Sequence, residues 1–236
     1  MYIYGKNVAK EKLQSNDKIN KAYVSKKFKD NEILEQLFKR NIRVNFVDNI
    51  VLDSKVDGLH QGIILDIDEF KTYELNEFLD DLKTNNNYHT LVMLDHLEDP
   101  HNFGAIIRTS EALGVEGIII PNDRSVSITS TVVKTSAGAI ENIKIIKVPN
   151  LTATISKLKE KNYWIVGTDM KGQNYREIDY NMNVCLVIGN EGKGMSKIVR
   201  DNCDFIASIP MTGKINSLNA SVSCGIILSQ IVSGRK

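Results

Sequence analysis

Short apolar runs followed by amphipathic stretches dominate the C-terminal two thirds of this 236-residue chain. Runs of four to six mostly apolar residues predict strands at 91–95, 117–120, 143–148, 163–167, 184–189 and 205–209. Helical periodicity follows four of these runs, at 103–114, 128–137, 151–161 and 217–232. Fully apolar strands that alternate with helices are typical of a parallel sheet covered on both faces. We therefore predict an α/β fold whose ligands bind beyond the carboxyl ends of the strands.

The first 70 residues form a separate pattern. It predicts a small α/β unit with strands at 19–24, 43–47 and 62–67 and helices at 7–13 and 30–40. An acidic amphipathic stretch that ends in three asparagines then precedes the apolar run at 91–95. This shift in composition predicts a domain at 1–70, a linker at 71–89 and a second domain at 90–236.

The composition excludes several classes of protein. With 42% hydrophobic and 25% charged residues, the chain is neither disordered nor a fibrous rod. Its three cysteines are far apart and lack histidines at metal-ligand spacing, which predicts neither a disulfide framework nor a metal site. No apolar stretch reaches the ~18 residues that a membrane span requires. We expect a reducing, cytoplasmic location without membrane attachment.

Charge is unevenly distributed although the net charge is only +1. Residues 1–47 contain eleven basic and five acidic side chains, residues 48–100 contain three and thirteen, and residues 101–236 contain sixteen and eleven. A basic N-terminal segment can bind a polyanion, but lysine-rich runs more often form a solvated helix or strand face. The pattern permits RNA binding without establishing it.

Three loops after predicted strands contain many potential ligand groups, and the first covers residues 95–104. Asn102 is suited to cap the helix that follows. On that helix Arg108 lies about 165° from the centre of the apolar stripe, so packing does not account for it. A solvated arginine is the simpler interpretation for an arbitrary helix.

The second loop, Gly189-Asn190-Glu191-Gly192-Lys193-Gly194-Met195-Ser196, has three glycines that allow close approach of a ligand. It has the spacing of a phosphate-binding P-loop, but Met195 stands where the lysine belongs, and the order is not G-x-G-x-x-G. An ordinary tight turn would have the same composition.

The third loop, at 209–221, leads into a helix rich in small residues, for which Ser217 is a plausible cap. Small side chains allow close packing against another helix or subunit. A structural cap with a buried helix would explain most of this segment, but not the recurrence of such loops at three places.

Other residues that could carry chemistry lack a supporting pattern. The histidines His60, His89, His96 and His101 are scattered, and each is more simply a surface or hydrogen-bonded side chain. Cys185, Cys203 and Cys224 are most simply small core residues. There is no G-x-S-x-G elbow and no H-E-x-x-H metal motif.

Taken together, the three loops resemble motifs one, two and three of the SpoU (TrmH-like) branch of the SPOUT methyltransferases. The matching elements are Asn102-x-Gly104-x-x-x-Arg108-Thr109, Ile188-Gly189-Asn190-Glu191-Gly192-x-Gly194, and Ile209-Pro210-Met211 with Ser217-Leu218-Asn219-Ala220-Ser221. The resemblance covers residues ~90–236. It implies methyl transfer from S-adenosylmethionine to a ribose 2′-hydroxyl of RNA, a C-terminal trefoil knot in the parallel sheet, and a homodimer with the site near the subunit interface.

The resemblance also implies roles for individual residues. By position, the cofactor would lie around Thr168, Gly189, Ile209 and Leu218. Arg108 would contact the 2′-hydroxyl and the adjacent phosphate, and Asn102 would fix the loop that presents it. The remaining motif side chains would organise the nucleotide and the arginine: Glu191, Ser217 and Asn219. No metal is implied.

The N-terminal region narrows the substrate. Ile3-Tyr4-Gly5-Lys6-Asn7 and His60-Gln61-Gly62 are similar to the subgroup that methylates a guanosine in the peptidyl-transferase region of large-subunit ribosomal RNA. In that subgroup the extra domain is ribosomal-protein-like and binds RNA. A tRNA ribose methyltransferase and an inactive RNA-binding module for ribosome assembly remain alternatives.

Overall fold

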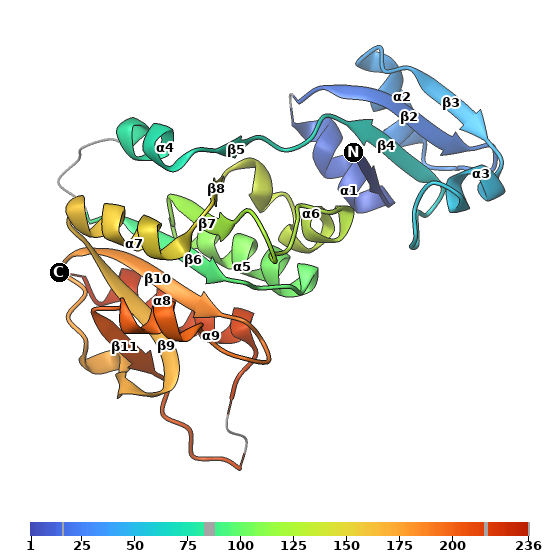
Figure 1. Ribbon diagram of the computed structural model, residues 1–236. Coiled ribbons are helices and arrows are strands. Elements are labelled where there is room, and N and C mark those ends of the chain that lie inside the picture. The colour runs from blue at the N-terminus through green and yellow to red at the C-terminus, as the bar shows by residue number, and fades with distance from the viewer. Residues whose placement is uncertain (16, 83–87, 215–216, 236) are drawn as a thin grey trace. The chain divides into compact units, whose positions relative to one another are not determined.

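The computed structural model describes residues 1–15, 17–82, 88–214 and 217–235, and these form two compact units (Figure 1). The first unit consists of Met1–Phe70 together with Ile128–Gly138. The second consists of Lys71–Ser127 and Ala139–Lys236. Within the described residues, no helix is long and apolar enough to cross a membrane.

The first unit contains a four-stranded mixed sheet in the order β1-β4-β2-β3. The strands are β1 (Tyr2–Tyr4), β2 (Ile19–Ser25), β3 (Val44–Val47) and β4 (Ile63–Ile67). The helices are α1 (Lys6–Gln14), α2 (Asn31–Lys39), α3 (Asn49–Asp53) and α6 (Ser130–Ser136). Asp30 begins α2, because its carboxylate accepts a hydrogen bond from the Ile33 backbone N–H.

One apolar core holds the first unit together. Alternate residues of β2, such as Ala22 and Val24, are fully buried and pack with Ile33 and Leu37 of α2. Val133 of α6 belongs to the same core although it is far away in the sequence. The segment Ile128–Gly138 therefore groups with the first 70 residues.

A seven-stranded parallel sheet organises the second unit, in the order β11-β9-β10-β6-β7-β8-β5. Its strands are β5 (Thr72–Tyr73), β6 (Thr90–Asp95), β7 (Gly117–Pro121), β8 (Lys144–Val148), β9 (Tyr163–Asn174), β10 (Asn183–Gly189) and β11 (Phe205–Ser208). Its helices are α4 (Leu75–Asp81), α5 (Pro100–Ala112), α7 (Leu151–Glu160), α8 (Lys197–Asp201) and α9 (Ala220–Ser233), with short 3-10 turns at Ala139–Glu141 and Tyr175–Glu177.

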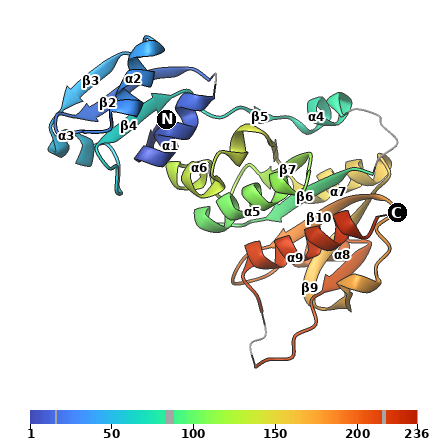
Figure 2. The same cartoon turned by 180° about the vertical axis from the view of Figure 1, so that it is seen from behind.

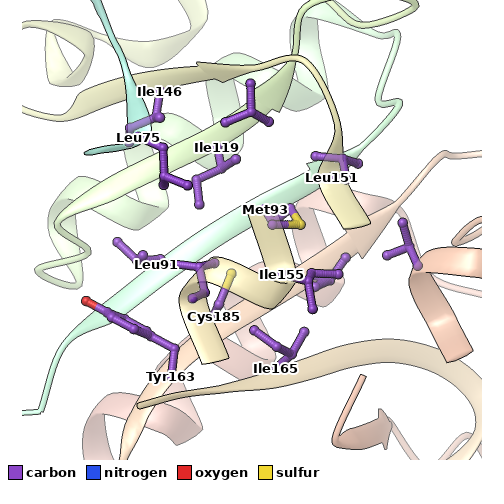
Figure 3. Packing of buried hydrophobic residues seen from close by; sticks show 14 of the residues in the cluster. Leu75, Leu91, Met93, Ile119, Ile146, Leu151, Ile155, Tyr163, Ile165 and Cys185 are labelled. Atoms are coloured by element: carbon purple, nitrogen blue, oxygen red, sulfur yellow. The ribbon is translucent and has the colours of Figure 1, made fainter. Parts of the chain in front are cut away.

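Helices cover both faces of this sheet. Two opposite views show α7 on one face and α5 beside α9 on the other (Figures 1 and 2). Under α7, Leu151 and Ile155 pack with Met93 and Ile165 of the sheet (Figure 3). The central strands β6 and β10 are buried along nearly their whole length. This burial confirms the parallel, doubly covered sheet predicted from their apolar runs.

The structure differs from the sequence interpretation in the linker and in two helix caps. Residues 71–82, expected to be linker, supply β5, which pairs with β8, and α4, whose Phe78 joins the core.

Helix α5 is capped by Asp99 rather than Asn102, because Pro100 fits the first turn and the Asp99 carboxylate accepts from His101 N–H at 3.0 Å. Helix α9 is capped by Asn219 rather than Ser217, since its side chain accepts from Ser221 N–H at 2.9 Å. The knot is not tested by strand order and stays a prediction.

Arg40 fastens the end of α1 in the first unit. Its guanidinium donates to the carbonyls of Lys12 at 3.2 Å, Leu13 at 3.0 Å, Ser15 at 2.8 Å and Asp17. The last carbonyls of a helix have no partner within the helix, and this side chain supplies donors to them and to the residues that follow.

We expect Arg40→Ala to lower the free energy of unfolding by about 2–3 kcal/mol, because several carbonyls lose a charged donor. Urea denaturation followed by circular dichroism measures the change. Lys39, the exposed residue before Arg40, provides the control. Lys39→Ala should change the free energy of unfolding by less than ~0.5 kcal/mol. Equal effects of the two substitutions would contradict this role for Arg40.

Candidate active site

A buried carboxylate joins the first two of the three loops. Asp95 ends β6 with only 1% of its surface exposed, and its Oδ2 accepts a hydrogen bond from Ser196 N–H at 2.6 Å. Asn190 reinforces the connection, because its Nδ2 donates to the His96 carbonyl at 2.9 Å. Strands β6 and β10 are neighbours in the sheet, so both loops leave the same edge. Their spacing is thus fixed by hydrogen bonds as well as by strand pairing.

A chain of side-chain hydrogen bonds brings in the third loop. Asn102 Nδ2 donates to Glu191 Oε1 at 3.1 Å, and Asn219 Nδ2 donates to Asn102 Oδ1 at 2.8 Å. Glu191 Oε1 also accepts from Asp99 N–H at 3.3 Å. Asn102, 6% exposed, uses its amide as donor and acceptor at once. Residues far apart in the sequence, Asn102, Glu191 and Asn219, therefore meet in one place.

The second loop folds back on itself at a position that only glycine fits. Asn190 and Gly194 form an isolated antiparallel bridge, with backbone hydrogen bonds of 3.0 and 2.9 Å. A Cβ on Gly189 would lie 2.3 Å from both Gly194 C and Met195 N, closer than real contacts allow. The glycine thus lets the turn close beside the end of β10.

The turn borders a cavity of about 680 Å³ at the carboxyl ends of the strands. All four residues expected around a cofactor, Thr168, Gly189, Ile209 and Leu218, line it. Glu191 and Ser217 also line it, whereas Asn102 and Asn219 reach it through their bonds to Glu191 and to each other. Thr168 is oriented by a 3.0 Å hydrogen bond from its hydroxyl to the Val187 carbonyl. The wall combines apolar side chains such as Ile209 and Leu218 with polar ones such as Glu191 and Ser217.

Arg108 lies elsewhere. It is exposed on α5 and is not among the residues that line the cavity. It stands six positions after Asn102 in the sequence, so its side chain points roughly 120° away from that of Asn102 round the helix. Helix α5 packs closely on α9, where a Cβ on Gly225 would lie 3.4 Å from Thr109 Cγ2. Within a single chain, the structure does not bring Arg108 to the other site residues.

Sequence reasoning missed the organising roles of Asp95 and Asn190. Asp95 carries a signal that could have revealed it, because a carboxylate that ends an otherwise apolar strand needs a hydrogen-bond donor nearby. Asn190 had no such signal, since its partner is a backbone carbonyl 94 residues away.

Burial disfavours the reactive thiolate form of all three cysteines. Desolvation raises the pKa of Cys203 and of Cys224 to about 12, so both remain protonated thiols at neutral pH. Cys185 is fully buried, and burial likewise raises its pKa. Across the described ranges, no group of three or more side chains is arranged to hold a metal ion.

Comparison with known proteins identifies the family. Residues 89–229 match the model of the "SpoU rRNA Methylase family", and residues 2–73 match "RNA 2'-O ribose methyltransferase substrate binding". A relative from Bacillus subtilis (strain 168), "Putative TrmH family tRNA/rRNA methyltransferase YacO", is 40% identical and covers 99% of this chain and 96% of its own.

Solved structures with similar folds differ in how much of the chain they match. An AdoMet-bound rRNA methyltransferase from Sinorhizobium meliloti is 25% identical, with a TM-score of 0.75 over 98% of this chain and 85% of its own. The TrmH/SpoU tRNA modifying enzyme of A. aeolicus is 32% identical, with a TM-score of 0.57 over 63% of this chain and 76% of its own. With both family models matched in order, the chain belongs to the SpoU family and is an RNA methyltransferase of that family.

Proposed function

We propose that this enzyme methylates the ribose 2′-hydroxyl of a guanosine in the peptidyl-transferase region of large-subunit ribosomal RNA. The observation that carries the proposal is the hydrogen-bonded chain Glu191–Asn102–Asn219 beside the cavity. It joins three loops that are far apart in the sequence into one site for a cofactor and a nucleotide. Asn102 is 89 residues from Glu191 and 117 residues from Asn219. The same residues carry the family motifs.

The N-terminal unit favours ribosomal RNA over tRNA. Residues 2–73 match a substrate-binding model, and the S. meliloti protein named as an rRNA methyltransferase matches 98% of the chain. The A. aeolicus protein named as a tRNA modifying enzyme matches only 63%. The B. subtilis relative is named for both substrates, so tRNA is the second candidate.

The cavity fits S-adenosylmethionine, the cofactor of this family. Its volume of about 680 Å³ is within the range of small-molecule sites. Ile209 and Leu218 offer apolar surface to an adenine ring, and the Gly189 turn offers backbone polar groups. When bound, this cofactor supplies an electrophilic methyl group on a sulfonium. Around it, the protein has to orient the ribose oxygen at near-attack distance and help that oxygen lose its proton.

Arg108 acts in this proposal as a charged clamp and not as a general base. Removing a proton from a guanidinium at neutral pH costs several kcal/mol, because this group is effectively always protonated in proteins. A planar guanidinium is well suited to bidentate contact with phosphate, which would orient the adjacent 2′-hydroxyl. The proton would then leave to phosphate or water. Glu191, held by Asn102, and Ser217 would organise the nucleotide at the cavity.

A homodimer would complete the site. Arg108 is exposed and lies outside its own cavity, so we infer that it serves the cavity of a second copy. Exposed apolar side chains on α9 support a subunit interface at this helix, because Val222 and Val232 are 48% and 39% exposed. Helix α9 packs beside α5, which carries Arg108.

The direct test is transfer of labelled methyl from S-adenosylmethionine to ribosomal RNA and to bulk tRNA, followed by mapping of the 2′-O-methylated nucleotide. We expect labelling of one guanosine in large-subunit rRNA. Labelling of tRNA alone would establish the second candidate. If calorimetric titration shows that S-adenosylmethionine does not bind, the result would favour an inactive RNA-binding module.

We expect Gly189→Ala to weaken S-adenosylmethionine binding at least tenfold, because the added Cβ overlaps backbone atoms of Gly194 and Met195 and forces the turn open. Gly213→Ala is the matched control. Gly213 also lines the cavity, but a Cβ there meets nothing within 4 Å. Calorimetry measures both affinities. Equal loss in the two variants would contradict the role of the Gly189 turn.

We expect Arg108→Ala to abolish methyl transfer while S-adenosylmethionine affinity stays within about twofold, since this side chain does not line the cavity. Arg108→Lys should retain a trace of activity, because the charge remains but the planar fork is lost. Single-turnover assays and calorimetry measure the two quantities. A loss of cofactor affinity as large as the loss of rate would refute the assignment.

Mixing two inactive variants tests whether the site is shared between subunits. Arg108→Ala and Glu191→Ala chains that reassort at random should recover about a quarter of wild-type activity, because half the dimers then contain one intact site of two. No recovery in verified mixed dimers would place both residues in a site made by one chain.

A further inference from the structure

The first unit contains its own groove, which the methyl-transfer site does not use. Its volume is about 540 Å³, and its wall is built from the start of α1 at Lys6, the β2–α2 loop at 25–29, two residues of α3, and the loop at 58–62. That last loop contains His60-Gln61-Gly62, one of the motifs that distinguished the N-terminal region in the sequence. All of these residues lie within Met1–Phe70, so the groove belongs to one unit.

Three lysines line the groove, and two of them lack an acidic partner among the described residues. Lys27 and Lys29 line it and are exposed, and their side-chain ammonium groups form no hydrogen bond or ion pair with other described residues. Lys6 also lines it, with Nζ 3.9 Å from an Asp30 carboxylate oxygen. By contrast Lys26, which does not line the groove, pairs with Asp48 at 2.8 Å. The ammonium groups of Lys27 and Lys29 are thus available to a ligand in the groove.

The loop at 58–62 is held in one conformation by hydrogen bonds. His60 is 8% exposed, and its Nδ1 accepts from Gly62 N–H at 2.9 Å. Its Nε2 therefore carries the proton and donates to Asp53 Oδ1 at 2.9 Å. The Gln61 side chain accepts a hydrogen bond from Lys6 N–H at 2.8 Å. The Gln61 backbone has a positive φ of 52°, a conformation that non-glycine residues rarely adopt. Such over-determined strained backbone is typical of binding sites.

The same loop presents an apolar side chain to solvent. Leu59 is 73% exposed and lines the groove together with the partly buried ring of Phe28. The groove wall also contains Asn49 and Asp53. Asn49 Oδ1 accepts from Ser25 Oγ at 2.7 Å and Asp53 Oδ1 from His60, which leaves Asn49 Nδ2 and Asp53 Oδ2 to bond the edge of a base. An ordered wall, an apolar surface, groups that can hydrogen-bond a base and two lysines without an acidic partner therefore occur together.

We propose that this groove binds one unstacked nucleotide of the RNA substrate, with its base against Leu59 and Phe28 and its flanking phosphates on Lys6, Lys27 and Lys29. The volume suits a single nucleotide, and unstacked bases of loops and bulges are what proteins recognise in RNA. The inference rests on the proposed function, because it requires an RNA substrate. It adds a second point of contact that selects RNA by an exposed loop nucleotide.

The test compares two double variants of the whole 236-residue chain that remove the same charge from the same unit. Lys27→Ala/Lys29→Ala should weaken binding of the mapped rRNA fragment about tenfold at 0.1 M salt and reduce the slope of log K against log salt by about 1.4. Lys18→Ala/Lys39→Ala is the control, because both lysines lie outside the groove wall. The groove variant should raise KM for RNA while kcat and S-adenosylmethionine affinity stay unchanged.

A second pair of variants tests the contact with the base. Leu59→Ala should weaken RNA binding about fivefold without changing the salt slope, because it removes apolar contact and no charge. Phe38→Ala, at a side chain 56% exposed on α2, is the control and should bind as wild type. Both residues are largely exposed, so thermal unfolding should be unaffected by either change.

The outcomes separate this inference from the proposed function. If the wild-type enzyme methylates RNA but the groove and control variants have equal KM and equal salt slopes, the groove proposal is wrong and the proposed function stands. If the wild-type enzyme transfers no methyl group to any RNA, the proposed function fails first. Equal weakening by both lysine pairs would indicate a diffuse positive surface and would overturn a defined nucleotide site.

Discussion

The candidate site depends on one doubly hydrogen-bonded amide. Asn102 donates to Glu191 and accepts from Asn219, and so joins loops that follow three different strands. An aspartate there would place a second carboxylate beside Glu191, and a leucine would remove a donor from Glu191 and the acceptor of Asn219 Nδ2. Only a side chain that is donor and acceptor at once satisfies both neighbours. The geometry of the cavity edge follows from that requirement.

Most strands of the second unit could be predicted from the hydrophobic pattern of the sequence. The apolar runs predicted β6, β7, β8, β10 and β11 to within a residue or two, because a buried parallel strand has to be apolar on both faces. The strand β9 continues to Asn174, well beyond its apolar run. The sequence pattern did not predict this second half, because it is largely exposed and polar. Short elements such as β5 and α8 were not predicted, since two to five residues give no measurable period.

The site was predicted unevenly, and the reasons are physical. Thr168, Gly189, Ile209 and Leu218 share a cavity because the ends of parallel strands meet at one edge of a sheet. The cap assignments for Asn102 and Ser217 were wrong, because the more suitable Asp99 and Asn219 were already present nearby. Periodicity could not locate Arg108, since an exposed arginine has the same pattern whether it serves solvent, its own cavity or a neighbouring subunit.

The placement of α6 has a consequence for how the protein can be divided. Val133 lies in the apolar core of the first unit, although the chain reaches it only after several strands of the second. Cutting the gene after residue 70 would therefore split one core between two polypeptides and leave each with an uncovered apolar surface. Independent expression of either half calls for grafting Ile128–Gly138 onto the N-terminal fragment, not for a simple truncation.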